Sequence, residues 1–194
     1  FDIKKAYRSI SVEGLEVIGT GFFGTVYRID NETIVKVCKG KESIPMIEIE
    51  KRMSQEAFLA GIPTAISFDI VKVGEDYGAV YEMLNARTFH DIVKESLMPL
   101  DEVFEKYIQL LRTVHGTEMK SGEFPSVKER FLGYLDFLKS FLTTEQYRGM
   151  KRLFDNMPEE NTVVHCDIQM KNVKYAGDEA MLIDMDTLGL GNKV

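Results

Sequence analysis

Two segments late in the sequence place polar side chains directly after short apolar runs. In the first, which reads VVHCDIQMKN, two valines precede His165, Asp167 and Asn172. In the second, which reads LIDMD, an apolar pair precedes Asp184. Carboxylate and amide oxygens at the ends of buried segments are hard ligands that suit Mg²⁺ held against phosphate oxygens. The two segments therefore predict a site at which Asp167, Asn172 and Asp184 converge on a divalent cation, phosphate oxygens and a hydroxyl nucleophile.

A glycine-rich segment lies within three short runs of alternating apolar and polar residues. The runs cover residues 10 to 18, 24 to 30 and 33 to 39, a pattern typical of an antiparallel meander. Glycines at positions Gly19, Gly21 and Gly24 would let the backbone close over a polyphosphate and aim N–H groups at it. Because a strand and not a helix follows, the segment favours a hairpin lid over a dinucleotide-binding unit.

The third run contains a lysine among apolar residues. An alternation of period two places Ile34, Lys36 and Cys38 on one face of the strand and Val35 and Val37 on the other. Two interpretations of Lys36 stay open. It is either an edge lysine whose ammonium reaches solvent or a ligand for phosphates beneath the glycine lid, and its place one strand after the lid favours the second.

A helix is expected over residues 43 to 60, with Ser43 as its N-cap. At the helical period, Glu50 lies within the broad apolar arc of this helix. We therefore expect Glu50 to pair with Lys36. Glu56, at the other edge of the arc, is the alternative partner.

Two more strands are expected near residues 65 to 73 and 78 to 84, joined by a hairpin turn. The second ends at Glu82 to Leu84, where an extended connector would offer backbone N–H and C=O groups to a planar ligand. Beyond it the pattern is helical. Helices are expected near residues 100 to 116, 126 to 142 and 143 to 157, with their apolar faces in the core.

Composition limits the class of protein. A chain of 194 residues with 44% hydrophobic residues can bury a core in one domain or two small lobes. A net charge of −7 argues against a broad nucleic-acid-binding surface, and the two well-separated cysteines favour reduced thiols. The sequence has no membrane-length apolar run and no signal-peptide pattern. It predicts a soluble, cytoplasmic protein with no nucleic-acid or membrane partner.

In combination, these motifs resemble the protein-kinase-like fold, and in particular the aminoglycoside phosphotransferase and choline kinase branch of small-molecule kinases. GTGFFGTVY is similar to the nucleotide lid, TIVK to the lysine strand and YEML to the hinge. HCDIQMKN is similar to the catalytic loop and IDMD to the metal-binding motif. All five motifs occur in the family's order over residues 19 to 186.

The resemblance implies an α+β, bilobal fold with an antiparallel-sheet N-lobe over residues 1–83. A helical C-lobe with the catalytic loop and metal motif would cover residues 84–194, and we expect its C-terminus to be truncated. The implied activity is phosphoryl transfer from ATP or GTP, with Mg²⁺, to a hydroxyl group of a small-molecule acceptor. Implied catalytic residues are Asp167, Lys36, Glu50 and His165, nucleotide-binding residues are Gly19, Gly21, Gly24, Val26, Lys36, Glu82 and Leu84, and metal ligands are Asn172 and Asp184.

Within this set, the resemblance implies that Asp167 orients the acceptor hydroxyl and takes its proton. Lys36 would hold the α- and β-phosphates, and His165 would brace the loop by hydrogen bonding. Asp186 would be a further group at or beside the metal.

Departures from the family bear on the alternatives. Gln169 stands where protein kinases have lysine, with Lys171 as the alternative contact to the γ-phosphate, and Cys166 stands where the branch usually has glycine. No Ala-Pro-Glu segment follows IDMD, which disfavours a Ser/Thr protein kinase. A non-catalytic nucleotide-binding pseudokinase or fragment is the other alternative, disfavoured because every catalytic side chain is present. The residues select neither the acceptor, nor ATP over GTP, nor an oligomeric state.

Overall fold

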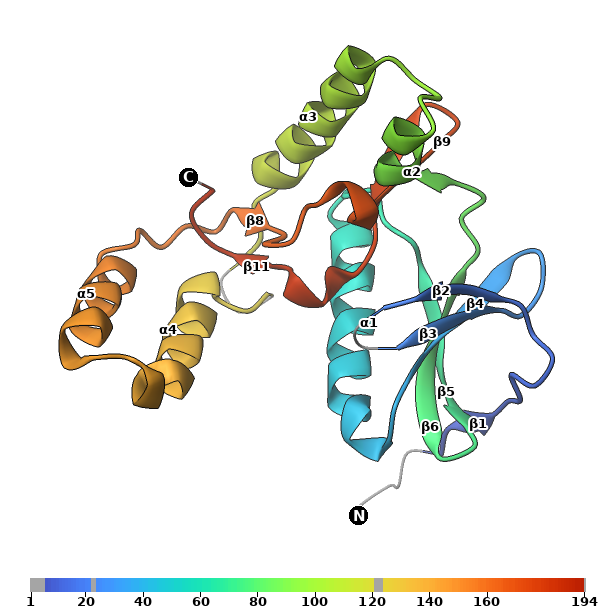
Figure 1. Ribbon diagram of the computed structural model, residues 1–194, viewed down its shortest axis with the longest axis horizontal. Coiled ribbons are helices and arrows are strands. Elements are labelled where there is room, and N and C mark those ends of the chain that lie inside the picture. The colour runs from blue at the N-terminus through green and yellow to red at the C-terminus, as the bar shows by residue number, and fades with distance from the viewer. Residues whose placement is uncertain (1–5, 22–23, 121–123, 194) are drawn as a thin grey trace. The chain divides into compact units, whose positions relative to one another are not determined.

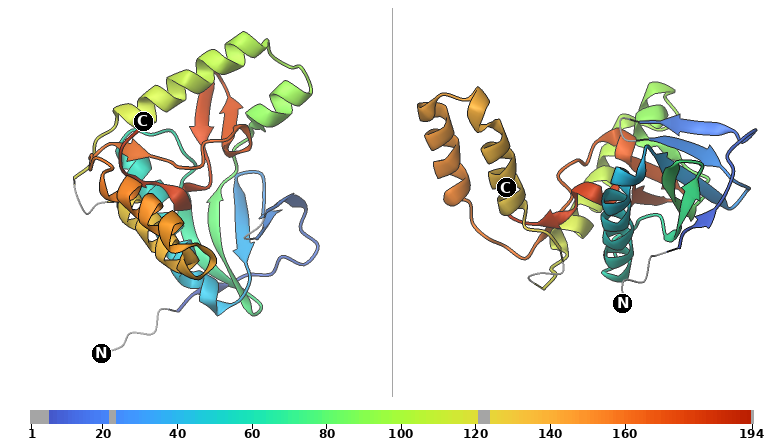
Figure 2. Two further views of the ribbon diagram at one scale, coloured as in Figure 1. Left: turned by 60° about the vertical axis from the view of Figure 1, so that its left-hand side comes forward. Right: turned by 90° about the horizontal axis from the view of Figure 1, so that it is seen from below.

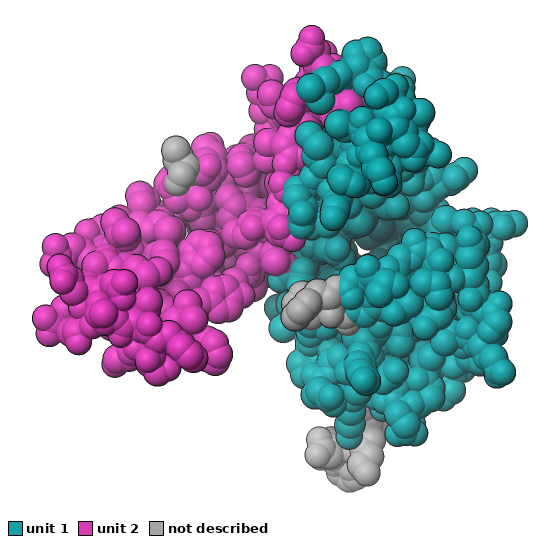
Figure 3. All heavy atoms as spheres, viewed as in Figure 1, with its two compact units in different colours: residues 1–100, 169–186 teal, residues 101–168, 187–194 magenta. Residues whose placement is uncertain are grey.

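The computed structural model describes residues 6–21, 24–120 and 124–193 of the chain, drawn as a ribbon in Figure 1. The chain forms two compact units, residues 1–100 with 169–186 and residues 101–168 with 187–194 (Figure 3). Helices and mainly antiparallel sheets confirm the expected α+β class. The expected lobe boundary between residues 83 and 84 is a different division of the chain and stays a prediction.

A six-stranded sheet forms the first unit's larger layer, with the strand order β1-β5-β6-β4-β3-β2. Neighbouring strands are antiparallel, except that β1 runs parallel to β5. The expected strand over residues 10 to 18 is wrong, because a turn at Gly14 with a φ of 76° interrupts it. The strands are β1 (Arg8–Ser9), β2 (Val17–Thr20), β3 (Thr25–Arg28), β4 (Thr33–Cys38), β5 (Ser67–Val73) and β6 (Asp76–Glu82).

The two faces of this sheet carry separate apolar clusters, which confirms the expected period of two in β4. Ile34 and Cys38 belong to a cluster with Ile47 of the following helix. Val35 and Val37 belong to the cluster on the opposite face. Lys36 lies on the face of Ile34 and Cys38, because alternate residues of a strand share a face.

The expected helix after β4 is α1 (Ile44–Leu59), which packs against β5 and β6 (Figure 1). Ser43 occupies the expected N-cap position, but its side chain does not cap the helix, because the Ser43 hydroxyl donates to the Gly40 carbonyl at 2.6 Å. The buried stripe is narrower than the expected arc, since the helix meets the sheet along one side only. Ile49 and Phe58 are therefore exposed, and the buried residues are Ile47, Glu50, Met53, Ser54 and Ala57.

The first unit also contains a small sheet with the strand order β10-β9-β7 and one further helix, α2. Their bounds are β7 (Arg87–Thr88), α2 (Phe89–Lys94), β9 (Val173–Ala176) and β10 (Glu179–Leu182). The second unit contains almost all of α3 (Leu100–Gly116), together with α4 (Val127–Leu138), α5 (Thr144–Asp155), β8 (Val163–Val164) and β11 (Gly189–Leu190). Across the described ranges, none of these helices has the length and apolar character needed to cross a membrane.

Helices α4 and α5 lie side by side (Figure 2), with the rings of Phe131 and Phe154 stacked at 5.7 Å. Both helices were expected, but much of their expected core face is exposed, including Tyr134 and Leu153. Among the described residues of the two helices, only Val127 and Leu135 of α4 are buried, and α5 has no buried residue. Apolar periodicity located the helices without fixing how far each would be covered.

We expect Leu135→Ala in α4 to lower the free energy of unfolding by about 2 to 5 kcal/mol, because Leu135 is only 2% exposed and its loss leaves a cavity. Phe137→Ala, two residues away, is the matched control. It removes a larger side chain that is 77% exposed, so it should change stability by less than about 0.5 kcal/mol. Urea unfolding followed by circular dichroism measures both. Equal losses would contradict the described orientation of α4.

Candidate functional site

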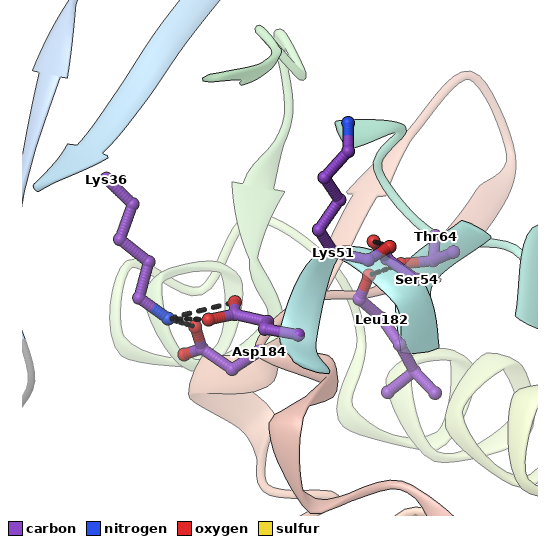
Figure 4. Close-up of polar contacts among 7 residues, drawn as sticks. Lys36, Lys51, Ser54, Thr64, Leu182 and Asp184 are labelled. Atoms are coloured by element: carbon purple, nitrogen blue, oxygen red, sulfur yellow. Dashed lines mark hydrogen bonds and ion pairs between the residues drawn. The ribbon is translucent and has the colours of Figure 1, made fainter. Parts of the chain in front are cut away.

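A lysine held by two carboxylates forms the centre of the first unit's polar site. Lys36 Nζ in β4 lies 3.0 and 3.1 Å from the Oε1 and Oε2 atoms of Glu50 in α1. The same ammonium lies 2.6 Å from Oδ1 of Asp184, which follows β10 (Figure 4). Lys36 therefore pairs with Glu50 and not with the alternative Glu56, and it also holds Asp184, a pairing that the sequence did not predict.

The charges in this cluster act on one another in opposite directions. Burial alone would lower the pKa of Lys36, but the carboxylates of Glu50 and Asp184 outweigh it and raise the pKa above its ordinary value. Burial raises the pKa of Glu50, Lys36 opposes this rise, and Asp184 and Asp186 add to it. The ammonium of Lys36 is thus the group that favours the charged form of Glu50 against both burial and the two aspartates.

Val26 and Ala79 flank Lys36 on the neighbouring strands. Val26 of β3 and Ala79 of β6 are both direct cross-strand partners of Lys36. Directly opposed residues in antiparallel strands project to the same face. The face that presents the ammonium therefore also presents an apolar surface on both sides of it.

The connector after β6 is less open than expected. The backbone N–H groups of Glu82 and Met83 donate to the carbonyls of Ile66 at 3.1 Å and Glu32 at 2.7 Å. The expectation that this whole segment offers bare N–H groups is therefore wrong. Leu84 packs against the apolar cluster on the face of Cys38, so its side chain lies on the same side of the sheet as Lys36.

The glycine-rich turn is held closed at its base. The Gly21 N–H donates to the Gly24 carbonyl at 2.9 Å. A Cβ at Gly24 would overlap the Val37 carbonyl oxygen, whereas no described atom lies within 4 Å of the Cβ position at Gly21. Packing therefore explains Gly24 but not Gly21, which leaves room for a ligand-related requirement there. Phe22 and Phe23 lie outside the described residues, so the lid as a whole stays a prediction.

The segments of Asn172 and Asp184 are joined through the backbone. Asn172 is buried at the end of a 3₁₀ turn, Met170–Asn172, and its carbonyl accepts the N–H of Ile183 at 3.0 Å. Asp184 comes next in the chain and adopts a left-handed φ of 59°. The first unit therefore brings the two expected metal ligands onto adjacent backbone segments.

The donor set fits Mg²⁺, which is bound by a few protein oxygens together with phosphate oxygens and water. Asn172 and Asp184 supply an amide and a carboxylate oxygen. Within residues 6–21, 24–120 and 124–193, no group of three or more His, Cys, Asp or Glu side chains could hold a metal ion. A cation held by Asn172 and Asp184 would complete its coordination with water or with oxygens of a bound ligand.

The loop that contains Asp167 belongs to the second unit and is braced on both sides. Thr187 Oγ1 donates to the His165 carbonyl at 2.5 Å and lies 3.5 Å from the ring Nδ1 of His165. The Tyr107 hydroxyl donates to the Ile168 carbonyl at 2.5 Å. His165 is fully buried, whereas Asp167 is exposed between these two anchored carbonyls.

Arg130 of α4 binds the segment that contains Thr187. Its guanidinium donates to the carbonyls of Thr187 at 2.5 Å and Leu188 at 2.9 Å. Cys166, between His165 and Asp167, has a φ of 63°, which explains why the branch usually has glycine at this position. Burial raises the pKa of the Cys166 thiol, and Arg130 opposes this rise.

Sequence reasoning missed three of these bracing residues, which are Tyr107, Arg130 and Thr187. Arg130 carried one signal, a charge next to Phe131 on the apolar side of its helix. The hydroxyl groups of Tyr107 and Thr187 bind backbone carbonyls, which every residue has, so no side-chain pattern marked them. Asp167 lies in one unit and Asn172 and Asp184 in the other, and their convergence stays a prediction.

Comparisons with known proteins identify the fold. No protein-family model matches the sequence, and no curated protein matches it. The streptomycin–ATP complex of APH(2")-IIa aligns with a TM-score of 0.63 at 15% identity, over 93% of this chain and 68% of that one. APH(3'')-Id from Streptomyces rimosus, with ADP and streptomycin, gives 0.65 at 15% identity, over 92% of this chain and 72% of that one.

A third structure, the GDP and kanamycin complex of APH(2")-IIIa, gives a TM-score of 0.58 at 12% identity, over 93% of this chain and 69% of that one. The chain therefore spans about two thirds of the length of these structures. It has the protein-kinase-like fold of the aminoglycoside phosphotransferases, which confirms the fold that the motifs implied.

We expect Lys36→Met to lower the free energy of unfolding by about 3 kcal/mol near neutral pH, because it leaves the Glu50 carboxylate buried without its cation. The deficit should shrink as the pH falls, because protonation of Glu50, whose pKa burial already raises, removes the unpaired charge. Urea unfolding over a pH series measures this. Lys151→Met, which breaks an exposed pair with Asp155, is the control and should show little change at any pH.

Proposed function

We propose that the protein transfers the γ-phosphoryl group of ATP or GTP to a hydroxyl group of a small molecule. The observation that carries this proposal is the buried Lys36–Glu50 pair with Asp184 bound to the same ammonium. The fold supports it, because the structures that align with this chain hold ATP, ADP or GDP together with a small hydroxyl-bearing antibiotic.

In the proposed nucleotide complex, Lys36 contacts the α- and β-phosphates while Glu50 continues to orient the ammonium. Phosphate oxygens then replace Asp184 as partners of Lys36. The glycines Gly19, Gly21 and Gly24 cover the phosphates, and the base lies against Val26 and Leu84 beside the backbone of Glu82.

Asn172 and Asp184 would hold Mg²⁺. The ion, when bound, neutralises charge on the β- and γ-phosphate oxygens.

In the proposed reaction the acceptor hydroxyl oxygen forms a bond to the γ-phosphorus as the bond from that phosphorus to the β–γ bridging oxygen breaks. ADP or GDP leaves, and the hydroxyl proton passes to the Asp167 carboxylate. Because the transition state is loose, the position of Asp167 contributes more than its basicity. The hydroxyl groups of Thr187 and Tyr107 serve that positioning by fixing the carbonyls of His165 and Ile168.

For the acceptor we propose a small polyhydroxylated molecule, and the aminoglycosides bound in the similar structures are the first candidates. The net charge of −7 is compatible with a cationic acceptor. We place the reaction in the cytoplasm, where ATP and GTP are available and where free thiols such as Cys38 and Cys166 stay reduced.

The proposal is tested by incubating the protein with Mg²⁺, ATP or GTP and an acceptor panel of aminoglycosides and sugars, followed by mass measurement of the products. A phosphorylated small molecule supports the proposal. Phosphorylated peptides would instead support a Ser/Thr protein kinase. Nucleotide binding without transfer to any acceptor would support a non-catalytic nucleotide-binding protein.

Asp167→Asn should reduce the transfer rate at least about a hundredfold, because an amide neither orients the acceptor hydroxyl as a carboxylate does nor accepts its proton. Nucleotide affinity should be unchanged, since Asp167 is not among the proposed nucleotide ligands. Asp178→Asn, at another exposed loop aspartate, is the matched control and should keep full activity. Steady-state kinetics and calorimetric titration with ADP measure both quantities, and an active Asp167→Asn enzyme would rule out the assigned role.

Tyr107→Phe should lower kcat about tenfold with the KM for nucleotide unchanged, because it frees the Ile168 carbonyl and loosens the backbone next to Asp167. Tyr134→Phe removes a hydroxyl from an exposed tyrosine of α4 and should have no effect. A change in the nucleotide KM alone would show that Tyr107 acts elsewhere.

A further inference from the structure

The segment that leaves α1 runs beside the strand that leads to Asp184. The Leu182 N–H donates to the Pro63 carbonyl at 2.9 Å. The Thr64 hydroxyl donates back to the Leu182 carbonyl at 2.9 Å (Figure 4). Thr64 is 4% exposed and Leu182 is fully buried. Both backbone polar groups of Leu182 are thus bound by two consecutive residues of one distant segment.

This segment is itself fixed to the helix that carries Glu50. Gly61 ends α1 with a φ of 85°, and the N–H of Ile62 returns to the Ala57 carbonyl at 2.9 Å. Ile62 is buried, so the chain enters Pro63 from a packed position. Thr64 therefore follows α1 after a short segment that is held to the helix by hydrogen bonding and burial.

On the other side, Leu182 leads directly to the expected metal ligands. The next residue, Ile183, donates its N–H to the Asn172 carbonyl at 3.0 Å. Asp184 follows, and its carboxylate binds the same Lys36 ammonium as Glu50. Leu182, whose backbone N–H and carbonyl are both hydrogen-bonded, thus lies two residues before Asp184.

We propose that Thr64 is a positioning residue whose hydroxyl, by holding the Leu182 carbonyl, fixes Asp184 and Asn172 in register with α1 for divalent-cation binding. This assignment rests on the proposed phosphotransferase function. The Lys36 ammonium cannot serve as the only tie between α1 and Asp184, because it must turn to phosphate when nucleotide binds. The Thr64 bond involves no group that a nucleotide would contact, so it persists through that exchange.

The test compares Thr64→Val, which keeps the shape and removes the donor, with Thr64→Ser, which keeps the donor. Ser54→Ala is the matched control, because the Ser54 hydroxyl is equally buried but donates within α1 to the Lys51 carbonyl at 3.0 Å (Figure 4). Thr64→Val and Ser54→Ala each lose one buried side-chain hydrogen bond. Only Thr64→Val removes a bond to the strand of Asp184.

Two measurements use the whole chain. Amide hydrogen exchange of the nucleotide-free protein over residues 179–186 should rise about fivefold in Thr64→Val, as expected for the loss of one hydrogen bond. The Mg²⁺ concentration that half-saturates ADP binding in calorimetric titrations should rise by the same factor of about five. Thr64→Ser should restore both values, and Ser54→Ala should change neither.

Unchanged exchange in Thr64→Val would overturn the assignment, because the strand would then not depend on the hydroxyl. Raised exchange with an unchanged Mg²⁺ requirement would also overturn it, since the bond would then serve stability alone. A wild-type protein that binds no ADP at any Mg²⁺ concentration would refute the proposed function itself. The assignment would fail with it, and the wild-type titration distinguishes that outcome from a failure of Thr64 alone.

Discussion

The buried ion pair of Lys36 with Glu50 is the interaction on which the first unit's site depends. It joins a strand of the large sheet to α1, and through Asp184 it reaches the segment after β10. Burial penalises both charges, so the pair adds less to stability than its short distances suggest, while loss of either partner is costly. Its main effect is specificity: a strand, a helix and a later loop must come together at one place, or a charge stays buried without a partner. The lysine that we propose to bind phosphate is thus the same residue that joins β4 to α1.

The sequence predicted the features that depend on neighbouring residues, and it did not predict the contacts between distant segments. The alternation of the six residues of β4 places Lys36 on the same face as Ile34 and Cys38, and the helical period places Glu50 on the buried side of α1. Both features are local, and both appear in the structure. The contacts of Thr64, Tyr107 and Thr187 join distant segments through backbone carbonyls, which look alike at every residue. The bond between Lys36 and Asp184 also spans 148 positions, and only the folded chain selects it.

Helices α4 and α5 were predicted from local patterns, but the burial of their apolar faces was not predicted correctly. Their amphipathic pattern and the capping box of Thr143 with Gln146 predict the helices well. The same pattern predicted a buried face, yet Tyr134 and Leu153 are exposed. An apolar stripe records which face a helix can bury, whereas burial also needs a partner surface of matching width. The stripe in α1 was overestimated for the same reason, because Ile49 and Phe58 lie beyond the edge of its contact with the sheet.

Backbone strain occurs beside Asp167 in one unit and at Asp184 in the other. Cys166 and Asp184 both adopt a left-handed φ near 60°, which costs a non-glycine residue about 1 kcal/mol or more. Each is pinned by hydrogen bonds at its chain neighbours, the His165 carbonyl in one unit and the Ile183 N–H in the other. A strained conformation persists only where such bonds over-determine it. The bonds are therefore placed where the backbone would otherwise relax, and relaxation at either residue would move Asp167 or the Asp184 carboxylate away from its neighbours. Ser96 and Asp178 adopt a similar φ, so the left-handed conformation is not confined to the two carboxylates that we assign to the reaction.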